Sequence, residues 1–439
     1  MVSSKLGLTL LVLATLFTST GFVLLSLVER GYVAWGTLWP AVALSGASLV
    51  AWAALRHWLP AGDPLFLPIA ILLCGLSLVL IARLAPNFLA RQTLWVSLGL
   101  GAMLAVALLP SASMGKMASR PTVDNLRWLR RYRYTWLTLG LLLLSLTLLF
   151  GVNPSGYGAR LWLGLSRLYF QPSELLKVVM VVFLASYLAE KRELLAVGGT
   201  RIGPWRVLPL PHLGPLLLMW GFSAVLLGWQ RDLGAALLFF GTFLAMLYAA
   251  TGREVYVWMG VGLFLISTIA GYQLFDHVRL RVDAWWNPWP EASGRAFQIV
   301  QSLLAFAAGG VLGQGLGQGY PTFIPVVHSD FAFAAIGEEL GLLGTLAVVI
   351  LFAVLVYRGF RTALAVGDAF AALLATGLST MLGLQALVIM GGTLKIVPLT
   401  GVTLPFVSYG GSSLVISFAM LGLLLRISAM TREDNHHAR

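Results

Sequence analysis

The feature that most constrains this chain is the recurrence of long apolar segments that carry few charges. Each segment is long enough to cross a hydrocarbon core of about 30 Å as a helix, and a helix satisfies its own backbone polar groups in lipid. The sequence therefore predicts an all-α polytopic integral membrane protein with about twelve transmembrane helices. The predicted spans are 6–29, 34–55, 64–85, 92–110, 134–152, 173–190, 209–228, 233–251, 254–275, 334–357, 368–391 and 404–426.

Composition excludes the main alternatives to a membrane protein. Apolar residues make up 59% of the 439 residues and charged residues only 10%, whereas soluble domains carry about 45–50% and about 25%. A net charge of +12 would suit a nucleic-acid binder in a soluble chain, but most Lys and Arg residues here fall on alternate loops. This bias marks the cytoplasmic loops of membrane proteins. It predicts that both termini are cytoplasmic and that there is no nucleic-acid partner.

Residues 276–332 form a long segment that contains no full predicted span. A loop of this length is usually functional or disordered. Its tryptophans and phenylalanines argue against disorder, and its glycines gather in residues 309–319. Under the predicted topology, this segment is a large, structured extracellular loop.

Five carboxylates lie at membrane depth or at its outer edge, where a charge is costly and is usually functional or paired. They are Glu174, Asp232, Asp330, Glu338 and Glu339. Asp330 stands where the outer loop enters a helix, so it is either the N-cap of that helix or an acid at the outer mouth of the bundle. Glu174 and Lys177, three residues apart, either neutralise each other or line a polar cavity. The residues alone leave both questions open.

A series of short motifs, each occurring once, extends over about residues 64–428. They are Arg83-Leu84-Ala85-Pro86, Arg91-Gln92-x-x-Trp95, Gly158-Ala159-Arg160-Leu161-Trp162-Leu163, Gln171-Pro172-Ser173-Glu174-x-x-Lys177, Gln230-Arg231-Asp232-Leu233-Gly234, Trp286-Asn287-Pro288-Trp289, Phe297-Gln298-x-x-Gln301-Ser302, the glycine run 309–319, His328-Ser329-Asp330-Phe331-Ala332-Phe333, Gly337-Glu338-Glu339-Leu340-Gly341 and Leu404-Pro405-Phe406-Val407-Ser408-Tyr409-Gly410-Gly411-Ser412. Together they resemble the SEDS family (shape, elongation, division and sporulation), the RodA and FtsW group of bacterial cell-wall polymerases, on its RodA-like side. Three positions differ from the family pattern: Arg160-Leu161 replaces Gln-Arg, and Ser329 replaces Thr.

The resemblance implies an architecture and an activity. Residues 61–428 would form a ten-helix core, preceded by two additional N-terminal helices in residues 1–60 and followed by a cytoplasmic tail at 429–439. The activity would be that of an inverting peptidoglycan glycosyltransferase in the bacterial cytoplasmic membrane. It would polymerise lipid II into β-1,4 glycan strands at the outer face, in elongation or division, beside a class B penicillin-binding protein. A flippase or transporter of the same lipid-linked precursor is the competing class, because many spans and intramembrane charges also suit transport.

The resemblance also assigns roles to individual residues. Asp330 is the predicted general base. Glu338 and Glu339 are predicted to be structural on a separate ground, since two adjacent acids on a helix point about 100° apart and cannot easily share one partner. The predicted substrate-binding residues are Trp162, Gln171, Glu174, Lys177, Arg231, Asp232, Gln298, Gln301, His328, Ser329, Lys395 and Ser408. The cations that could neutralise the substrate's pyrophosphate are Lys177, Arg231, Arg279, Arg281 and Lys395, without a ranking among them. No cofactor is certain, but a divalent cation, Mg²⁺ or Mn²⁺, could share that task with Asp330 and substrate phosphate.

Overall fold

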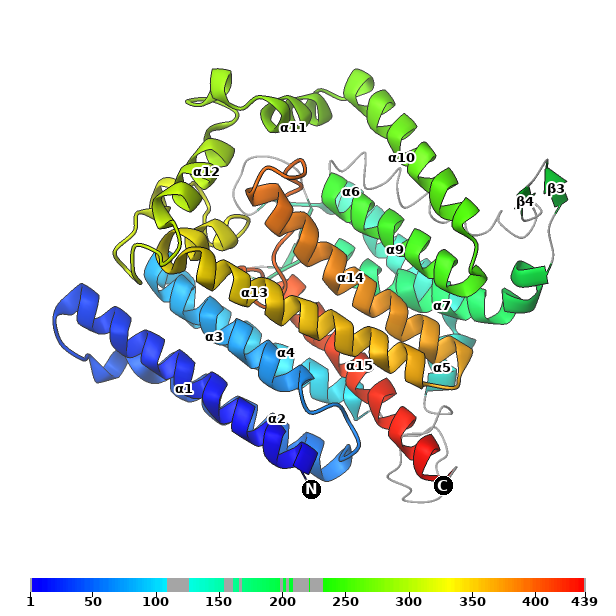
Figure 1. Ribbon diagram of the computed structural model, residues 1–439, viewed down its shortest axis with the longest axis horizontal. Helices are drawn as coiled ribbons and strands as arrows, with labels where there is room; N and C mark the ends of the chain where they lie inside the picture. The colour runs from blue at the N-terminus through cyan, green and yellow to red at the C-terminus, as the bar shows by residue number, and fades with distance from the viewer. Residues whose placement is uncertain are drawn as a thin grey trace.

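A computed structural model of the chain shows a bundle of long helices inclined in a common direction (Figure 1). The structure describes residues 2–108, 126–153, 161–165, 168–197, 200–202, 205–207, 221 and 232–437. Within these residues, eleven helices are long and apolar enough to cross a membrane. They are α1 (Val2–Arg30), α2 (Trp39–Trp58), α3 (Phe66–Leu84), α4 (Leu89–Ala107), α6 (Arg133–Phe150), α7 (Pro172–Val197), α9 (Leu233–Thr251), α10 (Glu254–Leu274), α13 (Ala332–Ala365), α14 (Ala369–Thr393) and α15 (Gly411–His437).

The prediction of an all-α polytopic membrane protein is confirmed by these helices. The remaining predicted span, 209–228, lies outside the described residues except for residue 221. The last span begins at Gly411 instead of residue 404, because residues 405–409 form turns.

The shorter elements are α5 (Arg127–Arg131), α11 (Asp276–Trp286), α12 (Phe297–Gly309), the 3₁₀ helices η1 (Trp35–Leu38), η2 (Pro86–Phe88), η4 (Trp289–Glu291) and η5 (Pro321–Phe323), and the antiparallel hairpins β1–β2 (Leu163–Leu165, Leu168–Phe170) and β3–β4 (Thr200–Ile202, Trp205–Val207).

The centre of the bundle is formed by α3, α7, α14 and α15, which are mostly buried, while α6 and α10 lie at its edge and are mostly exposed. Lipid tails are as apolar as the side chains, so membrane helices associate through close packing, which small residues allow. Gly422 of α15 lies against the backbone of Met103 in α4, and Gly99 of α4 leaves room for the ring of Phe418. These contacts bring together two helices that are far apart in the sequence.

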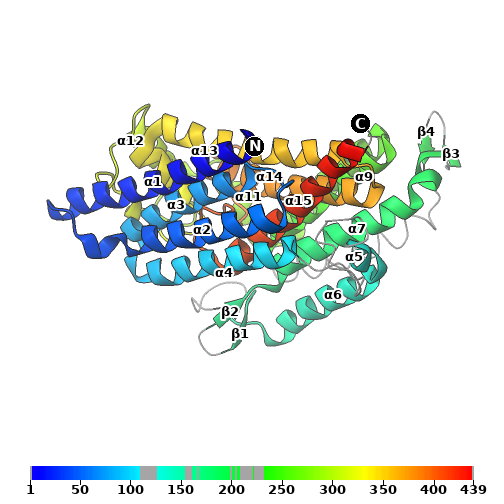
Figure 2. The same ribbon diagram turned by 90° about the horizontal axis from the view of Figure 1, so that it is seen from below.

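The two N-terminal helices pack on one side of this bundle (Figures 1 and 2). Helix α1 lies along α3, and α2 contacts both α1 and α4. Thr18 of α1 fills the space where a side chain on Gly75 of α3 would lie. The prediction placed two added helices in this part of the chain, and α1 and α2 occupy it.

The segment between α10 and α13, called the outer loop after its predicted side of the membrane, and the chain termini lie at opposite ends of the bundle. Figure 1 shows both termini at one end, and α11 and α12 beyond the other end. Residues 275–331, between α10 and α13, contain α11, α12 and two 3₁₀ helices, so the predicted loop is structured. The loop therefore sits on the side of the bundle away from the termini.

Helix α13 is broken at Gly341, whose φ is 64°. Only glycine adopts this conformation readily. The amide of Gln314 donates to the carbonyl of Glu338 (2.9 Å), and the amide of Leu342 donates to the carbonyl of Gly310 (2.9 Å). Irregular backbone at membrane depth is tolerated where it is buried and hydrogen-bonded in this way. The glycine run of the outer loop is thus joined to the broken helix.

The orientation of the bundle can be tested with single cysteines. Cys74 is buried and is the one cysteine in the chain, so Cys74→Ala gives a background without thiols. In that background we expect Ser293→Cys in the outer loop, but not Gly367→Cys between α13 and α14, to react in intact cells with a thiol reagent that does not cross membranes. Both positions are exposed, so both should react after permeabilisation. Labelling of position 367 in intact cells would reverse the orientation.

Candidate functional site

Asp330 lies at the end of the bundle away from the chain termini, directly before α13. The N-cap of α13 is Phe331, and this helix start has no side-chain cap. The Asp330 carboxylate instead accepts a hydrogen bond from Ser329 Oγ (2.8 Å), and its other oxygen faces Gly401, where a Cβ would lie 3.7 Å away. Helix capping therefore does not account for this acid. The remaining interpretation is an acid at the outer mouth of the bundle.

The turn before α15 holds the segment that contains Asp330. Ser408 Oγ donates to the carbonyl of Ser329 (2.5 Å) and accepts from the amide of Leu404 (3.0 Å). The amide of Tyr409 donates to the carbonyl of His328 (2.8 Å). The contacts of Ser408 are thus with the backbone, and they make it a positioning residue for the segment that carries Asp330.

His328 stands beside this acid in an aromatic cluster. Its ring stacks on Phe88, with 5.2 Å between centroids, and meets Tyr409 edge-on at 5.7 Å. Burial lowers the pKa of His328, because a charged imidazolium is poorly solvated there. His328 is therefore neutral at physiological pH.

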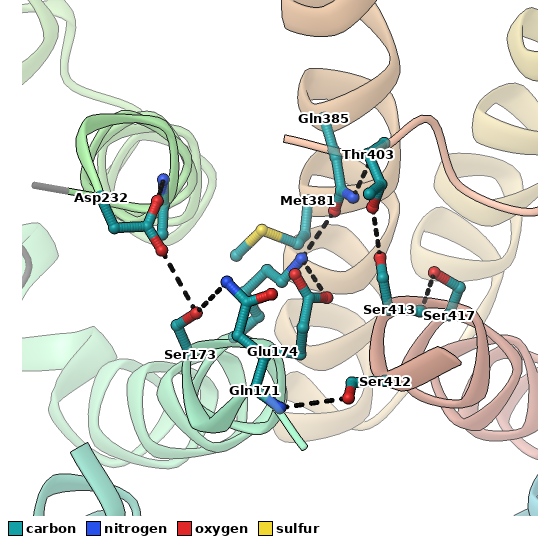
Figure 3. Close-up of polar contacts among 12 residues, drawn as sticks. Gln171, Ser173, Glu174, Asp232, Met381, Gln385, Thr403, Ser412, Ser413 and Ser417 are labelled. Atoms are coloured by element: carbon teal, nitrogen blue, oxygen red, sulfur yellow. Dashed lines mark hydrogen bonds and ion pairs between the residues drawn. The ribbon is translucent and has the colours of Figure 1, made fainter. Parts of the chain in front are cut away.

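A second polar cluster lies among α7, α9, α14 and α15 (Figure 3). Glu174 and Lys177 form an ion pair of 2.5 Å across one turn of α7, and both are buried. Lys177 Nζ also donates to Gln385 Oε1 (2.9 Å), and Gln385 Nε2 donates to the carbonyl of Thr403 (2.8 Å). Of the two interpretations that the sequence left open, these contacts match the self-neutralising pair. The residues Gln385 and Thr403 were not predicted; the signal available for Gln385 was a buried amide within an apolar helix.

Asp232 closes this cluster at the start of α9. Its carboxylate caps the helix by accepting from the amide of Ala235 (3.1 Å), and it also accepts from Ser173 Oγ (3.3 Å). Gln171 Nε2 donates to Ser173 Oγ (3.0 Å), and the Gln171 amide donates to Ser412 Oγ (3.1 Å). Burial raises the pKa of Asp232. The nearby negative charge of Glu174 also raises this pKa, and the positive charge of Lys177 lowers it.

Arg281 of α11 lies between the two clusters. Its Nη1 donates to the carbonyl of Thr400 (3.0 Å), in the loop between α14 and α15. Its guanidinium interacts electrostatically with both Asp330 and Asp232. Burial raises the pKa of Asp330, and the hydrogen bond from Ser329 and the positive charge of Arg281 oppose that rise. The site thus combines an acid with a cation beside it.

Glu338 and Glu339 both hold the glycine run of the outer loop. Glu338 Oε1 accepts from the amide of Tyr320 (2.6 Å). Glu339 forms an ion pair with Arg83 of α3 (Nε to Oε1, 3.5 Å), and Arg83 Nη2 donates to the carbonyls of Gly317 and Gly319 (3.3 and 3.2 Å). The structural role of the two glutamates stays a prediction, which variants at the two positions test.

Several predicted substrate-binding residues have their described contacts elsewhere than at Asp330. Gln298 and Gln301 lie on α12, where Gln298 Nε2 donates to a backbone carbonyl of the outer loop (3.1 Å). Trp162 forms a backbone bridge to the segment after α6, and Lys395 has a positive φ in the loop after α14. Arg231 lies outside the described residues. Within the described part of the chain, the structure gives these residues no hydrogen bond to Asp330.

The charged residues near Asp330 do not form a metal site by themselves. The described residues contain no group of three or more His, Cys, Asp or Glu side chains that could hold a metal ion. A Mg²⁺ ion often takes one or two carboxylates, with water and substrate phosphates as its other ligands. The single Asp330 carboxylate fits that kind of site only when it is shared with a substrate.

Comparison with known proteins identifies the family. A sequence model of the cell cycle protein family that comprises FtsW, RodA and SpoVE matches residues 69–433. The chain belongs to this family. Peptidoglycan glycosyltransferase RodA of Mycobacterium tuberculosis is 39% identical over 387 residues, which cover 85% of this chain and 80% of the relative. The RodA of Mycobacterium leprae is 37% identical over 408 residues, 89% of this chain and 84% of that protein.

Solved structures agree with this assignment. A chain from a peptidoglycan synthase complex that coordinates polymerization and crosslinking is 29% identical and has a TM-score of 0.67, covering 85% of this chain and 99% of that one. The rod shape determining protein RodA of Thermus thermophilus is 26% identical with a TM-score of 0.59, covering 84% and 96%. The predictions of a RodA-like SEDS protein and of a glycosyltransferase in cell-wall synthesis are confirmed. Helices α1 and α2 precede the residues that the family model matches.

The ion pair between Arg83 and Glu339 predicts a difference between the two glutamates. We expect Glu339→Gln to lower the free energy of unfolding by about 3 kcal/mol, because it leaves Arg83 without its counter-ion in a largely buried position. Glu338→Gln should cost less, since an amide oxygen can still accept from Tyr320. Thermal unfolding of the purified proteins in detergent measures both. Equal losses in the two variants would contradict this division of roles.

Proposed function

We propose that this SEDS protein polymerises lipid II into β-1,4 glycan strands at the outer face of the bacterial cytoplasmic membrane, with Asp330 as the general base. The observation that carries the proposal is the Asp330 carboxylate, which the Ser408 turn holds at the outer mouth of the bundle beside the guanidinium of Arg281. A site there can meet a lipid-linked headgroup while the lipid tail stays in the bilayer.

The proposed reaction is a single displacement with inversion. The acceptor's 4-hydroxyl on N-acetylglucosamine attacks the anomeric carbon of N-acetylmuramic acid in the donor. The bond from that carbon to the undecaprenyl pyrophosphate breaks, and its electron pair leaves with the pyrophosphate. Asp330 accepts the proton of the attacking hydroxyl, which requires the carboxylate form. Positive charge is needed where the pyrophosphate departs.

An apolar cavity supports the binding of a lipid substrate. It has a volume of about 430 Å³ and is lined by Trp95 of α4, by Leu163 and Tyr169 of the β1–β2 hairpin, and by Ser412 of α15, among others. Ser412 also accepts the hydrogen bond from Gln171, so the cavity adjoins the polar cluster. A mainly apolar lining suits a segment of a polyprenyl chain.

A class B penicillin-binding protein is the proposed partner, because a complex that contains a similar chain coordinates polymerization with crosslinking. Both termini share one end of the bundle, and we place that end in the cytoplasm because the basic residues favour it. The outer loop then faces the compartment in which cell wall is assembled.

Polymerisation of purified lipid II by the purified protein tests the proposed function. We expect glycan strands to form without an ion gradient. The competing function, a flippase, would instead move fluorescent lipid II between the leaflets of liposomes and form no strands. The latter outcome would refute the polymerase.

A divalent cation fits the proposed site as a shared ligand. Asp330 would hold it together with substrate phosphate, and the ion would stabilise negative charge on the pyrophosphate. We expect EDTA to lower the polymerisation rate and excess Mg²⁺ or Mn²⁺ to restore it. An unchanged rate after complete chelation would leave neutralisation to the protein's own cations.

A further inference from the structure

The cations that the sequence could not rank occupy different environments in the structure. Lys177 is buried and is already neutralised by Glu174. Arg279 is largely exposed, lies 4.0 Å from Asp276 in an ion pair, and stacks over the ring of Tyr272. The charge of Lys177 is therefore already used, and no contact of Arg279 within the described residues brings its charge to Asp330.

Arg281 differs from both because its guanidinium lies near two carboxylates, Asp232 and Asp330, and the described residues give it an ion pair with neither. Its side chain is half-buried. The carbonyl of Thr400 is the one hydrogen-bond acceptor that the described residues give it, through Nη1. A guanidinium has five N–H donors in a planar fork. Its Nη2 lies on the same side of the loop as Asp330, because Arg281 Nη2 and Asp330 Oδ2 lie 3.9 and 3.7 Å from the position of a Cβ on Gly401.

The absence of a side chain at Gly401 keeps this space open. Gly401 has a φ of 75°, which a residue with a Cβ adopts only under strain. The space between the acid and the guanidinium is therefore bounded by backbone. Backbone that carries no side chain lets a ligand group approach closely.

We propose that Arg281 binds the pyrophosphate of the polyprenyl donor and stabilises it as the leaving group. This inference rests on the proposed function, because it concerns the same site. A planar guanidinium with unused donors matches the oxygens of a phosphate group, and such charge-assisted hydrogen bonds are stronger than neutral ones.

Helix α11 positions Arg281 over the site. Trp285 Nε1, one turn later on α11, donates to the carbonyl of Lys395 (3.1 Å). Arg281 and Trp285 thus attach α11 to two points of the loop between α14 and α15. The Trp285 contact supplies anchoring without charge, so it allows anchoring and charge to be separated by mutation.

The experiment measures inhibition by undecaprenyl pyrophosphate and its binding to the full-length protein. We expect Arg281→Gln to weaken binding by about 10- to 100-fold, the value of a hydrogen bond to a charged group, and to lower kcat. Arg281→Lys should recover part of the affinity, since it keeps a charge but loses the fork. Arg279→Gln, on the same helix, removes a charge away from Asp330 and should bind as wild type. Trp285→Phe tests anchoring alone and should lose far less than Arg281→Gln.

The inference is overturned if Arg281→Gln binds undecaprenyl pyrophosphate as tightly as wild type, or if Trp285→Phe loses as much affinity as Arg281→Gln. If Arg281→Gln does not accumulate, the comparison of Arg281→Lys with wild type decides, with equal affinity counting against the inference. A wild-type protein that forms no strands from lipid II refutes the polymerase, whereas the binding measurement still reports on Arg281. The two failures are therefore distinguishable.

Discussion

Asp330→Asn is expected to lower the rate of glycan-strand formation from lipid II by at least about 100-fold. General-base catalysis typically contributes this much, and an amide cannot accept the proton. The substitution keeps the size of the side chain, and the amide oxygen can still accept from Ser329 Oγ. Protein yield and thermal stability should therefore stay near wild type. The measurement is strand formation by purified variants at matched protein concentration.

Asp330→Glu provides the matched control. It keeps the charge but moves it by one methylene group, and a displacement of about 1 Å can cost about 100-fold. We therefore expect Glu to be impaired although it can still accept a proton. An Asn variant within a few-fold of the wild-type rate would remove Asp330 from the role of base. The N-cap of α13 is Phe331 and not residue 330. Activity retained by the Asn variant could therefore not be explained by a capping role that Asn also fills.

The second large effect is expected for stability when the buried ion pair of α7 is broken. Lys177→Met removes the positive charge and leaves Glu174, with only 10% of its side chain exposed, without a counter-ion. Removing one partner of a buried pair costs about 3–5 kcal/mol. The unfolding free energy of the purified protein should fall by this amount, and Gln385 would lose the donor to its Oε1.

The double variant Glu174→Gln/Lys177→Met isolates the charge from the packing. It removes both charges and keeps the side-chain volumes, so we expect it to recover most of the lost stability. A double variant as unstable as Lys177→Met would show that packing, and not the unpaired carboxylate, causes the loss. Activity that returned with stability would assign the pair a structural role, whereas a stable but inactive double variant would place it in substrate binding.

The sequence by itself determined the membrane fold and the family. Apolar segments of spanning length have few alternatives to helices, because backbone polar groups cannot go unpaired in lipid. Each predicted span that falls within the described residues coincides with a helix. Most of the predicted ends, though not all, lie within a few residues of the ends of the helices. The motif around Asp330 likewise singled out this residue, since a charge at the membrane edge is rare and usually has a use.

Only the tertiary structure decided which residues act together. The sequence left Asp330 as either a helix cap or an acid at the outer mouth, and the position of Phe331 as the N-cap, without a side-chain cap, excluded the first. It could not rank Arg281 above Arg279, because two residues on one short helix differ only in what they face. The residues that Arg281 faces include Thr400 and Gly401 of the loop before α15, which is far along the chain. Packing between helices brings this loop close to α11. Local patterns specify a span, whereas the environment of a side chain depends on contacts between distant segments.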